Sequence, residues 1–149
     1  MAERSGDWLS QARRDLESAR AQRAAGFYEW ACFISQQASE KALKAVVQKL
    51  GGEPWGQSIV ELLGPLQERL EVPDALRGSA VNLDRYYIPA RYPNGWAAGS
   101  PADYFSAEDA NVAIGHSQAI LRFCEGVLAR PKLADEPDRP SDEEPRPPA

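Results

Sequence analysis

The helical pattern that decides the fold occupies residues 27–50, which read FYEWACFISQQASEKALKAVVQKL. Apolar side chains recur there every three or four residues, which is the period of an α-helix. A helix that is apolar around so much of its circumference is buried on two sides, so the pattern predicts a central helix of a bundle. The apolar positions are Trp30, Ala31, Phe33, Ile34, Ala38, Ala42, Leu43, Ala45, Val46, Val47 and Leu50.

The same period predicts helices on both sides of the central one. They cover residues 5–24, 58–70, 72–87 and 106–129. Ser58 and Ser106 precede two of them as N-caps, each with an acidic residue three positions later, and Pro65 is expected to bend or divide the helix that contains it. Strand-like alternation is missing from the sequence. The fold class expected is therefore all-α, an antiparallel bundle of four to five helices.

The stretch from residue 88 to 105 has no helical period and contains three prolines and two glycines. Loops of about 18 residues exceed the usual length, and such loops are often functional or mobile. This segment is therefore a candidate for part of a binding site.

Charge divides the chain into two parts. The net charge of the 149 residues is −5, but residues 131–149 hold six acids, three bases and six of the 12 prolines. Residues 1–130 carry a net charge of only −2. We expect residues 1–130 to form one helical domain and residues 131–149 to be an acidic, proline-rich disordered tail.

Composition excludes several classes of protein. No apolar run approaches the roughly 20 residues that span a bilayer, and the first residues do not resemble a signal peptide, so a cytoplasmic protein without membrane contact is expected. One histidine and two cysteines offer no multi-His or Cys-rich metal site, and no Gly-rich phosphate loop appears, so neither metal nor cofactor is expected. A broadly basic nucleic-acid-binding face is excluded as well.

Two polar motifs are candidates for binding. Gln37, Lys41 and Lys44 are spaced to line one face of the central helix, either as a phosphate-binding face or as a solvated stripe, and Glu40 is placed to pair with Lys44. A second run, LDRYYIPARYP at residues 83–93, packs three tyrosines and two arginines near a helix end. Arg binds phosphate bidentately and Tyr stacks on bases, so Tyr87, Arg91 and Tyr92 predict a small nucleotide site. The alternative is that the tyrosines pack in the core and Arg91 ties down the loop.

His116 is the only histidine in the chain. It is either a general base or a partly buried structural or interface residue, because its helix neighbours Ala113 and Ile120 are apolar. A couple with Cys124 is disfavoured, since eight residues on one helix span about 12 Å. Cys32 and Cys124 are expected to be small core residues.

Several motifs together resemble the HEPN domain, the higher eukaryotes and prokaryotes nucleotide-binding domain. They are Asp15-Leu16 with Ala19, Gly26-Phe27-Tyr28, Cys32-Phe33, the run QQASEKALKA at residues 36–45, the run YYIPARYP at residues 86–93 and the start of the final helix, Ala107 to Ala110. The resemblance covers about residues 7–130. It implies an antiparallel helical bundle, often a homodimer, commonly encoded beside a minimal nucleotidyltransferase in a toxin–antitoxin-like pair.

Many HEPN proteins are metal-independent ribonucleases that use an Arg followed after four to six residues by a His. Here no histidine follows Arg91 at that spacing, Asn94 cannot transfer a proton, and His116 does not match the motif. Loss of a catalytic base costs on the order of 10²–10⁴ in rate. The sequence therefore favours a non-catalytic, nucleotide- or RNA-associated module. A divergent ribonuclease toxin using Arg91 and His116, and a purely structural interaction module, are the alternatives.

Overall fold

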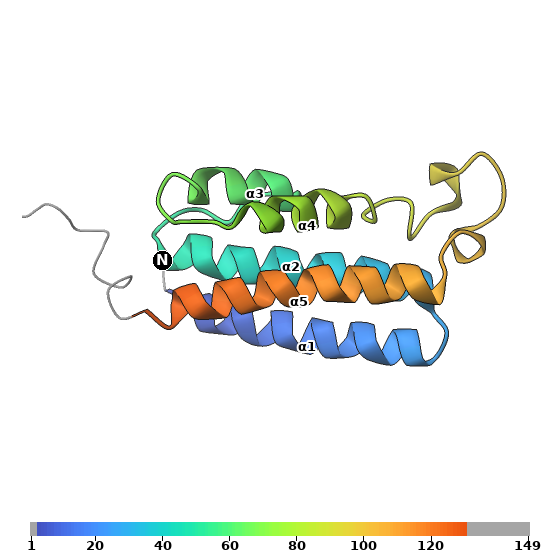
Figure 1. Cartoon of the computed structure of the whole chain (residues 1–149), viewed down its shortest axis with the longest axis horizontal. Coiled ribbons are helices and arrows are strands. Elements are labelled where there is room, and N and C mark those ends of the chain that lie inside the picture. The colour runs from blue at the N-terminus through green and yellow to red at the C-terminus, as the bar shows by residue number, and fades with distance from the viewer. Residues whose placement is uncertain (1–2, 131–149) are drawn as a thin grey trace, which may run out of the picture.

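The computed structural model describes residues 3–130, and the expected tail at residues 131–149 lies outside this range. Within it the chain forms five α-helices and no strand, so the all-α prediction is confirmed (Figure 1). The helices are α1 (Ser5–Ala24), α2 (Tyr28–Lys49), α3 (Ile59–Leu66), α4 (Asp74–Asp84) and α5 (Ala107–Leu128). Two short 3₁₀ helices, η1 (Pro93–Gly95) and η2 (Pro101–Asp103), lie between α4 and α5. None of the helices in residues 3–130 is long and apolar enough to cross a membrane.

α2 is the central helix, as its sequence predicts. It packs against α1, α5, α3 and α4 (Figure 1). Ala38, Ala42 and Ala45 on α2 have no exposed surface. Because these side chains are small, the neighbouring helices can approach α2 closely. Leu43 and Val46 are also fully buried and fill the space between the helices. Most apolar side chains of residues 27–50 are thus buried by packing on several sides, whereas Phe27 and Trp30 at the start of the run remain exposed.

Cross-helix contacts set the direction of each helix. α1 and α5 are antiparallel, since Arg13 pairs with Glu125 and Arg23 with Asn111. α2 and α3 run in the same direction because residues 50–58 double back along α2 (Figure 1). The Gln36 amide donates to the Gln57 carbonyl near the start of α3. Consecutive helices are otherwise antiparallel. The start of α1, the ends of α2 and α5 and the α3–α4 connection lie at the same end of the bundle (Figure 1).

A buried polar contact joins α2 to α5. Ser39 Oγ lies 2.9 Å from Ser117 Oγ, and both residues have no exposed surface. Ser39 also donates to the Ser35 carbonyl one turn earlier, and Ser35 does the same to Ala31. Each buried hydroxyl therefore has a partner, which removes the penalty that an unsatisfied polar group would impose on the core.

The first turn of α3 is capped by two elements. Ser58 Oγ accepts from the Glu61 N–H at 3.2 Å, which confirms the predicted N-cap. Asp84, at the end of α4, receives the Ile59 N–H at 2.8 Å and the Val60 N–H at 3.0 Å, and it accepts the Ser58 hydroxyl as well. A helix begins with unsatisfied N–H groups and a partial positive charge, so a carboxylate there stabilises it.

Two predicted helices are shorter than expected. α3 ends at Leu66 rather than residue 70, one position after Pro65, which lacks an N–H and crowds the preceding turn. α4 ends at Asp84 rather than residue 87, and the chain continues in turns through Arg91. The start of α5 is as predicted, with a full capping box between Ser106 and Asp109.

The long connection between α4 and α5 is packed by its own aromatic side chains. Trp96 stacks on Tyr104 with ring centroids 3.8 Å apart, and its indole N–H donates to the Pro89 carbonyl at 2.7 Å. The Tyr104 hydroxyl donates to the Ala98 carbonyl, and Phe105 contacts Trp96 edge-on. These contacts pack the aromatic side chains of residues 88–105 against one another and against the turn at Pro89.

Candidate functional site

Arg91 is positioned by the turns that follow α4. The backbone N–H of Arg91 donates to the Ile88 carbonyl at 3.0 Å, which keeps the backbone close to helical. Tyr87 and Arg91, four residues apart, therefore face the same side. The Arg91 Nε then donates to the Tyr87 carbonyl at 2.8 Å, so one of its five N–H groups is used to fix the side chain.

Three aromatic rings surround the guanidinium. The Arg91 Cζ lies 4.5 Å from the centroid of Phe33, 4.4 Å from that of Tyr87 and 4.8 Å from that of Tyr92. Phe33 belongs to α2, and its ring centroid lies 6.0 Å from that of Tyr87. We call Phe33, Tyr87, Arg91 and Tyr92 the Arg91 cluster. Cation–π contacts of this kind hold an arginine in place without neutralising its charge.

The charge of Arg91 has no acidic partner within residues 3–130, since none of the ion pairs found there includes it. Its Nη1 lies 3.5 Å from the Tyr92 hydroxyl, the outer limit of a hydrogen bond. Arg91 is half-buried and Tyr92 is exposed. The cluster thus presents a fixed, planar cation at the surface, the geometry that suits a phosphate group.

A cavity of about 430 Å³ adjoins the cluster through Tyr87. Its size falls in the usual range for small-molecule sites. It is lined by Gln57, Ser58, Asp84, Tyr87, Ile88 and Pro89. The loop before α3 and the turns after α4 therefore form a hollow next to the half-buried cation.

The lysines predicted on α2 are paired with carboxylates. Lys41 Nζ lies 2.5 Å from Asp15 Oδ2 on α1, and Lys44 Nζ lies 2.7 Å from Glu40 Oε2, which confirms the predicted Glu40–Lys44 pair. The alternative of a solvated stripe is wrong for that pair, because Glu40 is 7% and Lys44 8% exposed. The Trp8 ring of α1 lies over Lys44 and shields it from water.

Gln37 connects this polar stripe to the Arg91 cluster. It lies one turn after Phe33 on α2, and its amide donates to Gln36 and, at 3.3 Å, to Glu40. Phe33 and Lys44 are separated by about 16 Å along the helix axis. The structure therefore brings Tyr87, Arg91 and Tyr92 into one cluster, whereas Lys41 and Lys44 lie further along α2 in their own ion pairs.

His116 lies outside the Arg91 cluster. Its Nδ1 is 2.8 Å from Ser79 Oγ on α4, about two helical turns before Tyr87. The ring is half-buried, and burial lowers its pKa from the usual value of 6.5. Within one subunit His116 thus has the position of a structural residue between α4 and α5.

This lowered pKa predicts a pH dependence of stability. Burial favours neutral His116 in the folded chain, so the unfolded chain takes up a proton first as the pH falls below 6.5. The contribution of His116 to the free energy of unfolding is present above pH 6.5 and is lost at lower pH. The free energy of unfolding, measured by urea titration, should fall less between pH 7.5 and pH 5.5 for His116→Gln than for the unchanged chain. Equal losses in both proteins would contradict the prediction.

Both cysteines are core residues, as their sequence context predicts. Cys32 and Cys124 have no exposed surface. Burial raises the pKa of the Cys32 thiol to about 12 and raises that of Cys124 as well. At neutral pH neither supplies a thiolate nucleophile.

Two residues of the site region are missed by the sequence patterns. Phe33 counts there as part of an apolar face and of the family resemblance, without a role in binding, yet its ring covers Arg91. Asp84 lies within the run at residues 83–93 but is given no role there, yet it lines the cavity and caps α3. The signal for Phe33 is its place one turn before Gln37, whereas Asp84 has no local signal because its partners lie about 25 residues earlier in the chain.

Comparisons with known proteins agree on one family. The sequence model of the HEPN domain matches residues 5–127. Among solved structures, TT1696 from Thermus thermophilus is 43% identical, with a TM-score of 0.82 over 84% of this chain and 98% of that chain. ST0689, described as an archaeal HEPN homologue, is 40% identical with a TM-score of 0.72, over 84% of this chain and 98% of that one.

A HEPN domain protein from Thermotoga maritima, TM0613, is also 40% identical, with a TM-score of 0.69 over 83% of this chain and 98% of that chain. No curated protein matches the sequence. The matched range includes the positions of all four residues of the Arg91 cluster.

Proposed function

Because the chain belongs to the HEPN domain family, we propose that it is a non-catalytic module that binds a nucleotide or an RNA phosphate. In this proposal it forms a homodimer in the cytoplasm and partners a minimal nucleotidyltransferase as a toxin–antitoxin-like pair. Residues 1–130 act as the binding domain, and residues 131–149 act as a tail outside it.

The observation that carries this proposal is the state of Arg91. Its guanidinium is held by the Tyr87 carbonyl and three rings, while its charge has no acidic partner within residues 3–130. A phosphate that reaches Arg91 gains charge-assisted hydrogen bonds without first breaking an ion pair. Tyr92, which is 47% exposed, is available to stack on a base.

Gln37, Lys41 and Lys44 form the second part of the proposed site. They continue from Phe33 along α2. Gln37 and Lys41 are partly exposed and would meet the next phosphates of a bound strand, whereas Lys44 is buried beneath Trp8 and would first have to be uncovered. Lys41 and Lys44 would have to exchange Asp15 and Glu40 for phosphate, so we expect a smaller contribution from each lysine than from Arg91.

The non-catalytic part of the proposal rests on the residues around Arg91. Cleavage of RNA without a metal needs a group that takes up a proton, and His116, the only histidine of the chain, contacts Ser79 rather than the cluster. The cluster offers phosphate binding and stacking, and its members Phe33, Tyr87, Arg91 and Tyr92 include neither a histidine nor a carboxylate.

We predict that Arg91→Ala weakens binding of ATP or of a ten-nucleotide RNA by at least about tenfold. Arg91→Lys keeps the charge but loses the planar stack, so it should restore only part of the affinity. Arg77→Ala is the matched control, because Arg77 is exposed on α4 and lies outside the cluster. Fluorescence anisotropy at fixed salt measures all four proteins. Equal affinities would remove the nucleotide-binding part and leave a structural interaction module.

Dimerisation and the nucleotidyltransferase partner are tested separately. Three large apolar side chains are between 38% and 50% exposed: Val81 on α4, Ile88 after α4 and Val112 on α5. Their exposure supports an interface there. Light scattering after size exclusion measures the oligomeric state. An adjacent reading frame for a short nucleotidyltransferase would support the pair, as would co-purification of the encoded protein with this chain.

A divergent ribonuclease is the second candidate, favoured by the charge of Arg91, which has no acidic partner within residues 3–130. In that function Arg91 stabilises the phosphate and His116 of a second subunit acts as the base. The purified protein would then cleave RNA in the presence of EDTA, and His116→Ala would abolish cleavage. Intact RNA, or equal cleavage by His116→Ala, would reject it.

A further inference from the structure

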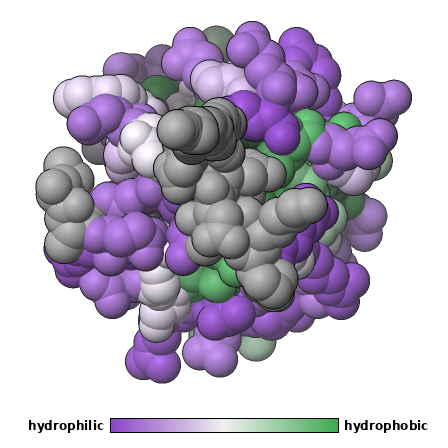
Figure 2. All heavy atoms as spheres, turned by 90° about the vertical axis from the view of Figure 1, so that its left-hand side faces the viewer, coloured by the Kyte–Doolittle hydropathy of each residue, from purple (hydrophilic) through white to green (hydrophobic). Residues whose placement is uncertain are grey.

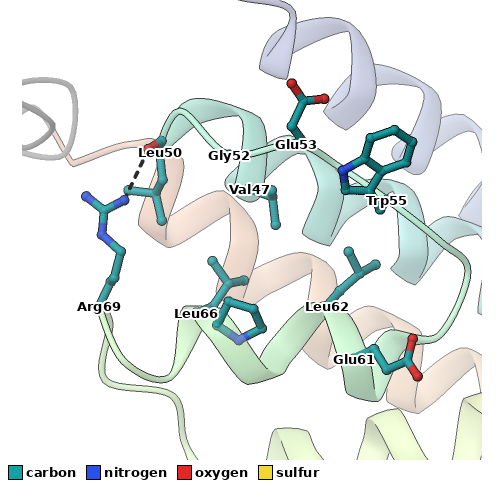
Figure 3. Close-up of a pocket in the computed structure, with 10 residues that line it drawn as sticks. Val47, Leu50, Gly52, Glu53, Trp55, Glu61, Leu62, Leu66 and Arg69 are labelled. Atoms are coloured by element: carbon teal, nitrogen blue, oxygen red, sulfur yellow. Dashed lines mark hydrogen bonds between the residues drawn. The ribbon is translucent and has the colours of Figure 1, made fainter.

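A second cavity of about 450 Å³ lies between the end of α2, the loop that follows it and α3 (Figure 3). We call it the α2–α3 groove. Its floor is apolar and consists of Val47, Leu50, Leu62, Pro65 and Leu66. Leu62 and Leu66 lie one turn apart on α3, so they form a short ridge along the groove. The volume exceeds what a single side chain needs.

Trp55 stands at one end of this groove and is 76% exposed, the most of the large apolar side chains in residues 3–130. Trp buries much apolar area when it is covered, and exposed tryptophans are frequent anchors of protein interfaces. The ring contacts among the described residues do not include Trp55. The Trp55 ring is therefore not used to pack the bundle.

Two carboxylates line the half of the groove that contains Trp55, Glu53 before it in the loop and Glu61 across the groove on α3, while the only cation that lines the groove within residues 3–130 lies at the far end. Glu53 and Glu61 are exposed and lie at the Trp55 end (Figure 3). Arg69 is at the opposite end, where its Nη1 donates to the Leu50 carbonyl at 3.1 Å. An indole ring beside two carboxylates favours a cationic side chain, through cation–π attraction and ion pairing together.

We propose that the α2–α3 groove binds a helical segment of another protein that carries two aliphatic side chains one turn apart and a Lys or Arg at one end. The aliphatic side chains occupy the apolar floor along Leu62 and Leu66. The basic side chain lies on Trp55 between Glu53 and Glu61. This is the helix-in-groove mode of recognition, in which spaced apolar anchors supply affinity and a charge sets the orientation.

Charge argues for this occupant over others. The chain's own segment 131–149 has six acids and three bases, so it is repelled by the two carboxylates beside Trp55. A nucleic acid is disfavoured by the same carboxylates. Figure 2 looks onto the end of the bundle where α2 and α5 end, and it shows hydrophobic surface among mainly hydrophilic residues there.

The groove and the Arg91 cluster are independent sites. Phe33 and Val47, which belong to the cluster and to the groove, are separated by about 21 Å along α2. The two sites share no lining residue. Peptide binding in the groove therefore goes beyond the proposed phosphate binding, and the failure of one leaves the other standing.

A library of displayed 16-residue peptides, selected on the full chain, tests the proposal. We expect the enriched peptides to share two aliphatic residues at i and i+4 and a Lys or Arg. Fluorescein-labelled copies should bind Trp55→Ala at least about tenfold more weakly than the unchanged chain. Selection on Glu53→Lys/Glu61→Lys should shift the enriched peptides from basic to acidic.

The matched control is Glu17→Lys/Glu108→Lys, which makes the same change in net charge at exposed positions of α1 and α5. It should retain the basic peptides, and Arg91→Ala should bind them unchanged. Enrichment of acidic peptides, or none at all, would overturn the proposal, as would equal binding by Trp55→Ala. Dissociation of a dimer by Trp55→Ala, or peptide binding seen only after Leu133→Ser, would instead assign the groove to a second copy or to the chain's own segment.

Discussion

Glu40→Ala should lower the free energy of unfolding by about 3 kcal/mol, the largest single effect that we expect for a polar residue of this chain. The side chains of Glu40 and Lys44 are 9% and 10% exposed, and their charged atoms lie 2.7 Å apart. Removing the carboxylate leaves the Lys44 ammonium largely out of water without its counter-ion. Gln37, whose amide also donates to Glu40, loses a partner at the same time.

A double variant separates lost charge pairing from lost packing. Glu40→Ala/Lys44→Met removes both charges, and we expect it to recover most of the lost stability, because an apolar replacement of a buried pair is often neutral. Glu17→Ala is the surface control, since its ion pair with Arg14 is exposed and spans 3.8 Å, and it should change stability by less than about 0.5 kcal/mol. Urea titration followed by circular dichroism measures each protein. Equal destabilisation of the single and double variants would contradict this explanation.

Asp84→Ala should lower the free energy of unfolding by about 2–3 kcal/mol. Asp84 accepts the N–H groups of Ile59 and Val60 and the hydroxyl of Ser58, and together these bonds satisfy the start of α3. Without the carboxylate, two helix N–H groups lose their acceptor and the partial positive charge of the helix end loses its counter-ion.

The loss should be concentrated in α3. Hydrogen exchange of the Ile59 and Val60 amides should accelerate more than that of the α5 core. Asp84→Asn keeps an accepting oxygen, so its free energy of unfolding should lie between those of the unchanged chain and Asp84→Ala. Asp74→Ala removes an exposed acid from the first turn of α4 and should cost no more than about 1 kcal/mol. Uniform acceleration across the bundle would show that Asp84 acts on global stability rather than on the α3 cap.

Most of the fold follows from local sequence pattern. The helical period of residues 27–50 identifies α2 and its central place, because only burial on several sides accounts for so many apolar positions. The N-caps at Ser58 and Ser106 can be predicted from the sequence for the same local reason, since each serine accepts a hydrogen bond from the N–H three residues later. The ends of α3 and α4 are less readable, because after Leu66 and Asp84 the chain keeps helix-like composition while its backbone turns.

The candidate site could be predicted only in part. The motif around Tyr87, Arg91 and Tyr92 marks a cation among aromatic rings, and the structure places these residues together. Its fourth member, Phe33, comes from α2 and enters only through the packing of α2 against the turns after α4. The role of Lys44 depends on the same kind of contact, because the Trp8 ring of α1 covers it.

The sequence by itself determined the all-α class, the number of long helices and the residues that carry the HEPN motifs, because helix period, caps and breakers act within a few positions of the chain. The tertiary structure alone decided that Glu40 and Lys44 are buried, that Asp84 caps α3, that Phe33 covers Arg91 and that Trp55 stands at an apolar groove. Each of these depends on which helices meet, and the burial and field that two packed helices impose on a side chain are not properties of either helix alone.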